Sequence, residues 1–121
     1  MAGIARFSVV CLDTRDPSRL ARFYSELTGL PIDHDGGDWI QLRSESGAAA
    51  LAFQLAPDHQ APQWPDADHP QQAHLDFDVP DLDAAEAAVL ALGAVKATYQ
   101  PGTTFRVYLD PAGHPFCLVR E

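Results

Sequence analysis

A histidine and two aspartates alternate with apolar residues in "QQAHLDFDVPDLD", residues 71–83. Successive side chains of a strand point to opposite faces, so His74, Asp76 and Asp78 would share one face and the apolar residues between them the other. An imidazole beside a carboxylate suits three roles: a metal ligand, a general base oriented by its acidic partner, or a pocket histidine satisfied by a hydrogen bond. The segment alone does not decide between these roles, and the three residues could instead form a solvated polar face.

The composition excludes several functional classes. The 121 residues, 46% hydrophobic and 21% charged, are typical of one soluble globular domain. The formal net charge of −9 provides no surplus of Lys and Arg to neutralise phosphates. We therefore expect neither a nucleic-acid partner nor binding to an anionic membrane surface.

The sequence also suggests a compartment. Its first residues, "MAGIARFSVV", lack the basic region and long apolar core of a signal peptide, and no apolar run approaches transmembrane length. We expect a cytoplasmic protein whose two cysteines, Cys11 and Cys117, are reduced thiols, and their spacing matches no zinc or redox motif.

One pattern occurs twice along the chain. A strand-like run leads to an aspartate suited to cap a helix, Asp16 or Asp81, and each amphipathic helix ends at a glycine, Gly29 or Gly93. Three further strand-like runs follow each helix, so we predict an α+β fold with two β-α-β-β-β modules. A single domain, residues 1–121, would comprise module one (1–56), a proline-rich linker (57–70) and module two (71–121).

Strand alternation predicts an uncovered sheet face opposite the helices. Aromatic side chains mixed with a few directional polar groups on this face favour a small-molecule cleft over a solvated surface. The residues expected there are Trp39, Gln41, Arg43, Gln54, His74, Asp76, Arg106, Tyr108 and Cys117. Trp64, in the linker, would cover the cleft mouth or seal an apolar edge.

Three segments carry a family resemblance: "VVCLDTRDPSRLARFYSELTGLP", "HLDFDVPDLDAAEAAVLALGA" and "YLDPAGHPFCLV". They resemble the vicinal oxygen chelate superfamily, in its glyoxalase/bleomycin-resistance/dioxygenase group, and especially the glyoxalase-like domain branch. The resemblance implies curved, antiparallel-rich sheets closing around a cleft, with the helices outside. It does not specify an activity, since members include isomerases, dioxygenases, thiol transferases and metal-free drug-binding proteins.

The resemblance also implies where a metal would bind. Metal-using members take one ligand from the first and one from the fourth strand of each module, commonly His, Gln or Glu. His74 matches such a position and Gln54 is a weak oxygen ligand, whereas Val9 has no donor and Cys117 replaces the usual glutamate. We therefore expect no cofactor, with a divalent metal held by His74, Gln54 and a third group as the alternative.

The resulting functional hypothesis is metal-independent binding of a small organic molecule, for sequestration or modest chemistry. Under this hypothesis the chemical groups are His74, Asp76 and Cys117, and the ligand contacts are Trp39, Gln41, Gln54, Trp64, Arg106 and Tyr108. Arg43 or Arg106 could bind a ligand carboxylate, and either could equally pair with the abundant acidic residues. Cys117 would act as a nucleophile if His74 or Arg106 lowered its pKa, and otherwise as a small buried apolar residue.

Two rival functions remain open at this point, and so does the question of catalysis. One is a metal-dependent lyase, isomerase or dioxygenase that uses His74, Gln54 and either Cys117 or Asp76. The other is a non-catalytic interaction module. Under each of them we expect a homodimer, because similar short members dimerise and the edges of an open sheet need covering.

Overall fold

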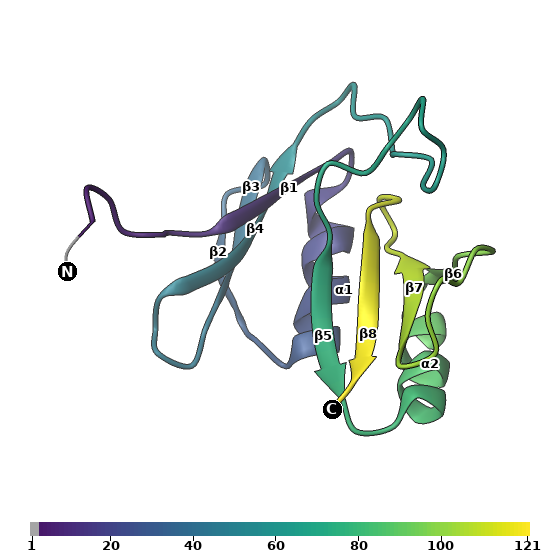
Figure 1. Cartoon of the computed structure of the whole chain (residues 1–121). Helices are drawn as coiled ribbons and strands as arrows, with labels where there is room; N and C mark the ends of the chain where they lie inside the picture. The colour runs from purple at the N-terminus through teal and green to yellow at the C-terminus, as the bar shows by residue number, and fades with distance from the viewer. Residues whose placement is uncertain (1–2) are drawn as a thin grey trace. The chain divides into compact units, whose positions relative to one another are not determined.

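The computed structural model describes residues 3–121 (Figure 1). The described residues divide into two compact units, one up to residue 59 and the other from residue 60 to 121. The division lies inside the proline-rich segment 57–70, and each unit is described below by itself.

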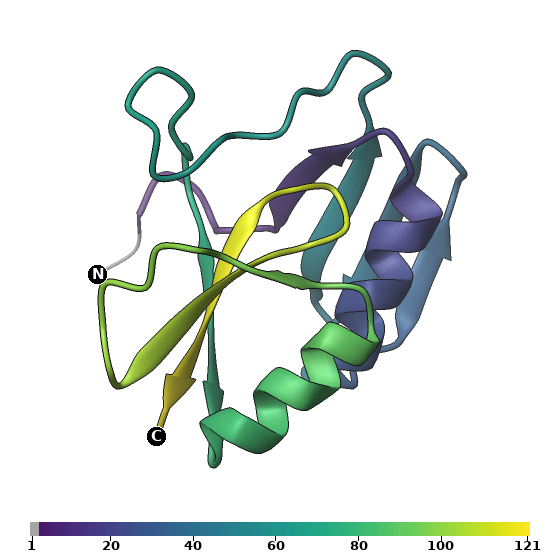
Figure 2. The ribbon, with the colours of Figure 1, turned by 90° about the vertical axis from the view of Figure 1, so that its right-hand side faces the viewer.

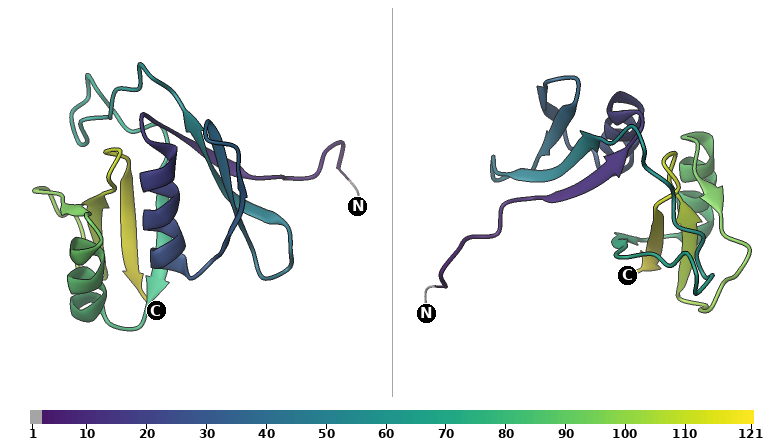
Figure 3. Two further views of the ribbon diagram at one scale, coloured as in Figure 1. Left: turned by 180° about the vertical axis from the view of Figure 1, so that it is seen from behind. Right: turned by 90° about the horizontal axis from the view of Figure 1, so that it is seen from above.

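The N-terminal unit is a four-stranded mixed sheet with one helix (Figure 3, left). The strand order is β1-β4-β3-β2, with β1 parallel to β4 and the other neighbours antiparallel. The helix α1 packs against β3 and β4. The elements are β1 (Val10–Thr14), α1 (Pro17–Thr28), β2 (Ile32–Asp35), β3 (Trp39–Arg43) and β4 (Ala49–Leu55).

The C-terminal unit repeats this arrangement (Figure 2). Its order is β5-β8-β7-β6, again with one parallel pair, β5 and β8, and with α2 packed against β8. The predicted α+β fold of two similar β-α-β-β-β modules is confirmed. The elements are β5 (Leu75–Val79), α2 (Leu82–Ala91), β6 (Val95–Lys96), β7 (Phe105–Leu109) and β8 (Pro115–Arg120).

Both helices begin where the sequence predicts. The Asp16 carboxylate accepts a hydrogen bond from a backbone N–H of the first turn of α1, and Asp81 accepts two in α2. Gly29 ends α1 with a φ of 77°, in the left-handed region that favours glycine. Within residues 3–121, no helix has the length and apolar character needed to span a membrane.

Each helix buries one face of its own sheet. Tyr24 of α1 stacks on Phe53 of β4, with the two ring centroids 5.6 Å apart, and Ile40 of β3 is buried in the same core. In the C-terminal unit, Tyr108 of β7 stacks on Phe116 of β8 at 5.6 Å, and both side chains are fully buried. These faces contain the cores, so any binding site within a unit must use the opposite face or a loop.

A tight turn between β7 and β8 contacts the first residues of the C-terminal unit. The Asp110 carboxylate accepts hydrogen bonds of 2.9 Å from the N–H groups of Ala112 and His114, and Gly113 has a φ of 90°. A Cβ at Gly113 would lie 2.4 Å from the Cβ of Ala61. The loop after residue 60 therefore packs directly against this turn.

Replacing Gly113 with alanine should lower the free energy of unfolding by about 2–3 kcal/mol, because backbone strain and a steric overlap add. In an Ala61→Gly background, Gly113→Ala should lower the free energy of unfolding by about 1 kcal/mol less than it does in the wild-type chain. Ala61→Gly removes the steric overlap but leaves the backbone strain. Urea denaturation followed by circular dichroism measures both differences. A double-mutant cycle with no coupling would contradict the close contact.

Candidate functional site

Three chemically different side chains meet at the start of β5. The parallel pairing of β5 with β8 sets Asp76 opposite Cys117, and His74 immediately precedes β5. Potential ligand atoms of His74, Asp76 and Cys117 all lie within 4.8 Å of one another. His74 Nε2 is 3.3 Å from Asp76 Oδ1, so the imidazole and the carboxylate form a close pair. The structure thus brings together the three residues predicted as chemical groups.

These three residues line a pocket of about 350 Å³ within the C-terminal unit. Its wall is largely apolar, and its polar side chains gather around His74, as small-molecule sites require. Sequence reasoning did not select five of the lining residues, all from β7, β8 and the loops. The complete lining is Trp64, Gln71, His74, Asp76, Pro101, Phe105, Val107, Cys117 and Val119.

The predicted contact residue Trp64 lies in the wall of this pocket. Its ring is 5.5 Å from that of Tyr99, which precedes β7, and it also lines a second hollow of about 600 Å³ beside Val95 and Lys96. The Tyr99 ring therefore packs against Trp64 and helps to hold its side chain in the proline-containing loop. Trp64 thus forms an aromatic part of the pocket wall.

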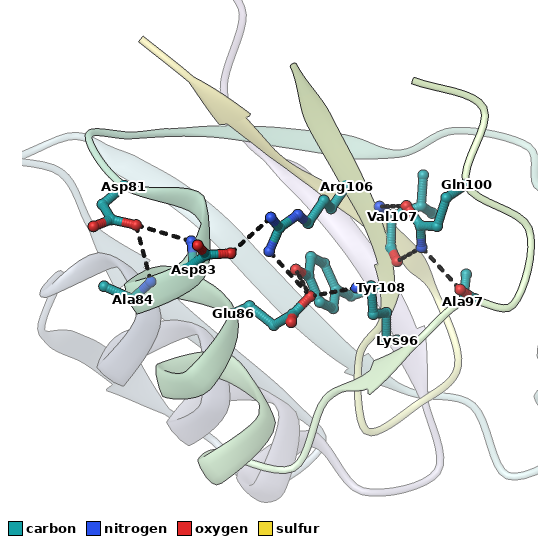
Figure 4. A network of polar contacts seen from close by, with 10 residues as sticks. All are labelled: Asp81, Asp83, Ala84, Glu86, Lys96, Ala97, Gln100, Arg106, Val107 and Tyr108. Atoms are coloured by element: carbon teal, nitrogen blue, oxygen red, sulfur yellow. Dashed lines mark hydrogen bonds and ion pairs between the residues drawn. The ribbon is translucent and has the colours of Figure 1, made fainter. Parts of the chain in front are cut away.

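The side chain of Gln100 positions the loop that contributes Pro101. Its amide nitrogen donates to the carbonyl groups of Ala97 and Val107, both at 2.8 Å, and its amide oxygen accepts the Val107 N–H at 2.9 Å (Figure 4). Gln100 thus pairs with β7 as a neighbouring backbone strand would. This attachment fixes the loop beside the Val107 part of the pocket wall.

The thiol of Cys117 is poorly suited to act as a nucleophile. Burial, and then the negative charge and hydrogen bond of Asp76, raise its pKa to about 11. The thiol is therefore protonated near neutral pH and can donate to the carboxylate. The hypothesis that His74 or Arg106 lowers this pKa is wrong, because burial and then Asp76 raise it and Arg106 lies on the other face of the sheet.

The predicted placement of Arg106 and Tyr108 on the uncovered face is also wrong. In the β7–β8 ladder Arg106 pairs with Leu118 and Tyr108 with Phe116, whereas Val107 pairs with Cys117. Residues opposite each other in a ladder share a face, so Arg106 and Tyr108 point towards α2. Val107 occupies the pocket face instead.

Arg106 and Tyr108 belong to a polar cluster centred on Glu86 of α2 (Figure 4). The Glu86 carboxylate accepts from the Tyr108 hydroxyl and from Lys96 Nζ, both at 2.8 Å, and lies 3.4 Å from Arg106 Nη1. Arg106 also donates to Asp83 at 2.8 Å. Lys96, and then Tyr108, hold the pKa of Glu86 below its ordinary value. This cluster joins α2 to the sheet.

The other predicted contact residues lie in the N-terminal unit, on the sheet face opposite α1. Trp39 and Gln54 are ladder partners there, and the Trp39 indole donates to Gln41 Oε1 at 2.8 Å. Arg43 forms an ion pair with Asp33. That Trp39, Gln41 and Gln54 contact the same ligand as the C-terminal residues stays a prediction.

The four-ligand metal arrangement implied by the resemblance does not fit this chain. Aligning Asp16 with Asp81 carries the Val10–Leu51 ladder pair onto Leu75–Phe116. The same alignment sets Val9 at the position of His74 and Ala52 at that of Cys117, and neither side chain can bind a metal. Gln54 corresponds to Val119, two residues beyond the expected ligand position. The donors that do gather are those of the C-terminal unit.

Comparison with protein-family models gives a match over nearly the whole chain. The model described as a glyoxalase-like domain matches residues 9–119. A search of curated proteins found no match.

Solved structures show the same fold at low sequence identity. A glyoxalase/bleomycin resistance protein/dioxygenase family enzyme from Burkholderia phytofirmans PsJN superposes with a TM-score of 0.70 at 20% identity, over 93% of this chain and 96% of that one. A glyoxalase-related enzyme from Fulvimarina pelagi gives 0.70 at 19%, over 98% and 89%. The fosfomycin resistance protein FosX from Listeria monocytogenes gives 0.71 at 14%, over 98% and 95%. At these identities the likeness concerns the fold alone.

Glu86 should stabilise the fold most strongly at neutral pH. Its lowered pKa means that the stabilisation is complete above the ordinary value of 4.5 and is lost as pH falls through the lowered pKa. Glu86→Gln should therefore destabilise the protein at pH 7, and the difference from wild type should shrink between about pH 5 and pH 3. Urea titrations at several pH values measure this. Asp78→Asn, an exposed carboxylate of β5, is the control and should not reproduce the profile.

Cys117 should react slowly with alkylating reagents. At pH 8 a thiol with a pKa of about 11 is about one part in a thousand thiolate. In a Cys11→Ser background, iodoacetamide should label Cys117 at least about fiftyfold more slowly than a free thiol. Asp76→Asn should accelerate the reaction and Asp78→Asn should not. Mass spectrometry gives the rates, and equal rates in both variants would contradict the assigned role of Asp76.

Proposed function

The chain belongs to the glyoxalase-like domain family of the vicinal oxygen chelate superfamily, and we propose that its C-terminal unit binds a small organic molecule, for sequestration or modest chemistry. One observation carries the proposal: a largely apolar pocket of about 350 Å³ with the His74–Asp76 pair in its wall. An apolar wall contributes most of the binding free energy, and a few polar groups set the orientation of a ligand.

The lining suggests a division of roles. The ring of Trp64 and the side chains of Phe105 and Val107 pack against the body of the ligand. His74 and Asp76 exchange hydrogen bonds with its polar end. Binding of this kind needs no metal, because Cys117 and His74 can satisfy the Asp76 carboxylate through their own protons.

A metal-dependent lyase, isomerase or dioxygenase is the second candidate. The gathering of nitrogen, oxygen and sulfur donors from His74, Asp76 and Cys117 within 4.8 Å favours it. Such a mixed set suits a zinc-like cation, which when bound would polarise an oxygen atom of a substrate. The candidate requires this three-residue set, because the N-terminal counterparts Val9 and Ala52 provide no donors.

Fluorescence of a single tryptophan tests the proposal. The chain has two tryptophans, so Trp39→Phe leaves only Trp64. A panel of small aromatic and aliphatic compounds should include members that change Trp64 emission saturably. Phe105→Ala should weaken their binding about tenfold through lost apolar contact. Leu90→Ala, an exposed apolar residue of α2, is the matched control and should leave it unchanged.

Elemental analysis distinguishes the two candidates. Saturable binding by metal-free protein supports the proposal. About one metal ion per chain, lost in His74→Ala, would favour the second candidate instead. Emission from Trp64 that ignores every compound, with or without added zinc, would contradict both candidates.

A further inference from the structure

Asp76 is the formally charged group of the pocket wall. None of the nine lining residues is Lys or Arg. Beside the carboxylate, Cys117 is hydrogen-bonded to it and His74 Nε2 lies 3.3 Å from its Oδ1. About half of the Asp76 side chain is exposed, so a ligand can reach the carboxylate.

The cations of the C-terminal unit are placed elsewhere. Residues 60–121 contain three Lys or Arg and nine Asp or Glu. Lys96 and Arg106 form ion pairs with Glu86 and Asp83 on the helix side of the sheet. Arg120, the last residue of β8, is not among the lining residues. An anionic ligand would therefore meet Asp76 without a compensating lysine or arginine in the wall.

We infer that the pocket selects a ligand with a cationic nitrogen attached to an apolar, aromatic body. The ammonium group would pair with the Asp76 carboxylate and lie near the Trp64 ring, whose face attracts cations. The apolar part would contact Phe105, Val107 and Val119. This inference rests on the proposed binding function, and it differs from the sequence-based alternative in which Arg106 binds a ligand carboxylate.

Three probes of nearly the same shape test the inference: 2-phenylethylammonium, 2-phenylethanol and 3-phenylpropanoate. Titrations of the full chain with Trp39→Phe, at pH 7.5 with EDTA, follow the Trp64 indole N–H signal by NMR. The ammonium should bind at least about fivefold more tightly than the alcohol, and the carboxylate more weakly than the alcohol.

Two matched variants locate the charge effect. Asp76→Asn should bring the ammonium and alcohol affinities to within about twofold, whereas Asp78→Asn removes the same charge outside the pocket lining and should preserve the preference. An ammonium that binds no better than the alcohol, or a preference removed equally by both variants, would overturn the inference while leaving the binding function intact. If none of the three probes shifts the Trp64 signal saturably, the inference fails, whereas the proposed binding function is decided by the broad compound panel.

Discussion

The register of β8 between its two neighbours determines which side chains reach the pocket. β8 is hydrogen-bonded to β5 on one side and to β7 on the other. Phe116 and Leu118 point to the helix, whereas Cys117 and Val119 line the pocket. A slip of one residue would exchange the two sets. The Asp76–Cys117 contact exists only in the observed register.

The helix side of the sheet supplies interactions that hold this register. Tyr108 is fully buried, stacks on Phe116 and donates its hydroxyl proton to Glu86. Shifting β7 by one residue would withdraw the hydroxyl from Glu86 and leave a buried polar group unsatisfied, at a cost of roughly 1–3 kcal/mol. Side chains that never touch the pocket therefore define which residues of β7 line it.

The helix starts could be predicted from local sequence, whereas the buried face of β7 could not. The helix starts at Asp16 and Asp81 follow from capping chemistry within a few residues. The segment "FRVYL" alternates along its length, and this alternation predicts that its apolar positions face the core, because cores are apolar. A pocket wall is apolar as well, so periodicity could not identify the buried face. The hydrogen bond from Tyr108 to Glu86, two residues far apart in the sequence, determines which face of β7 is turned towards the helix.

The same limit applies to the pocket itself. His74, Asp76 and Cys117 were recognisable because their side chains carry chemistry, and the parallel β5–β8 pair brings them together. Phe105 and Val107 carried no such signal, since apolar strand residues are ordinary core residues. Only the pairing of β7 with β8 reveals that they face a hollow rather than the helix.

The two modules show why the fold and the chemistry are specified separately. At equivalent ladder positions the helix-facing residues are apolar in both units: Leu51 and Phe53 in one, Phe116 and Leu118 in the other. The positions between them differ freely, with Ala52 in the first unit and Cys117 in the second. Helix packing constrains alternate residues only, so the opposite face can gain or lose polar groups without changing the architecture. This explains how a chain can match its fold relatives closely in structure while sharing few residues with them.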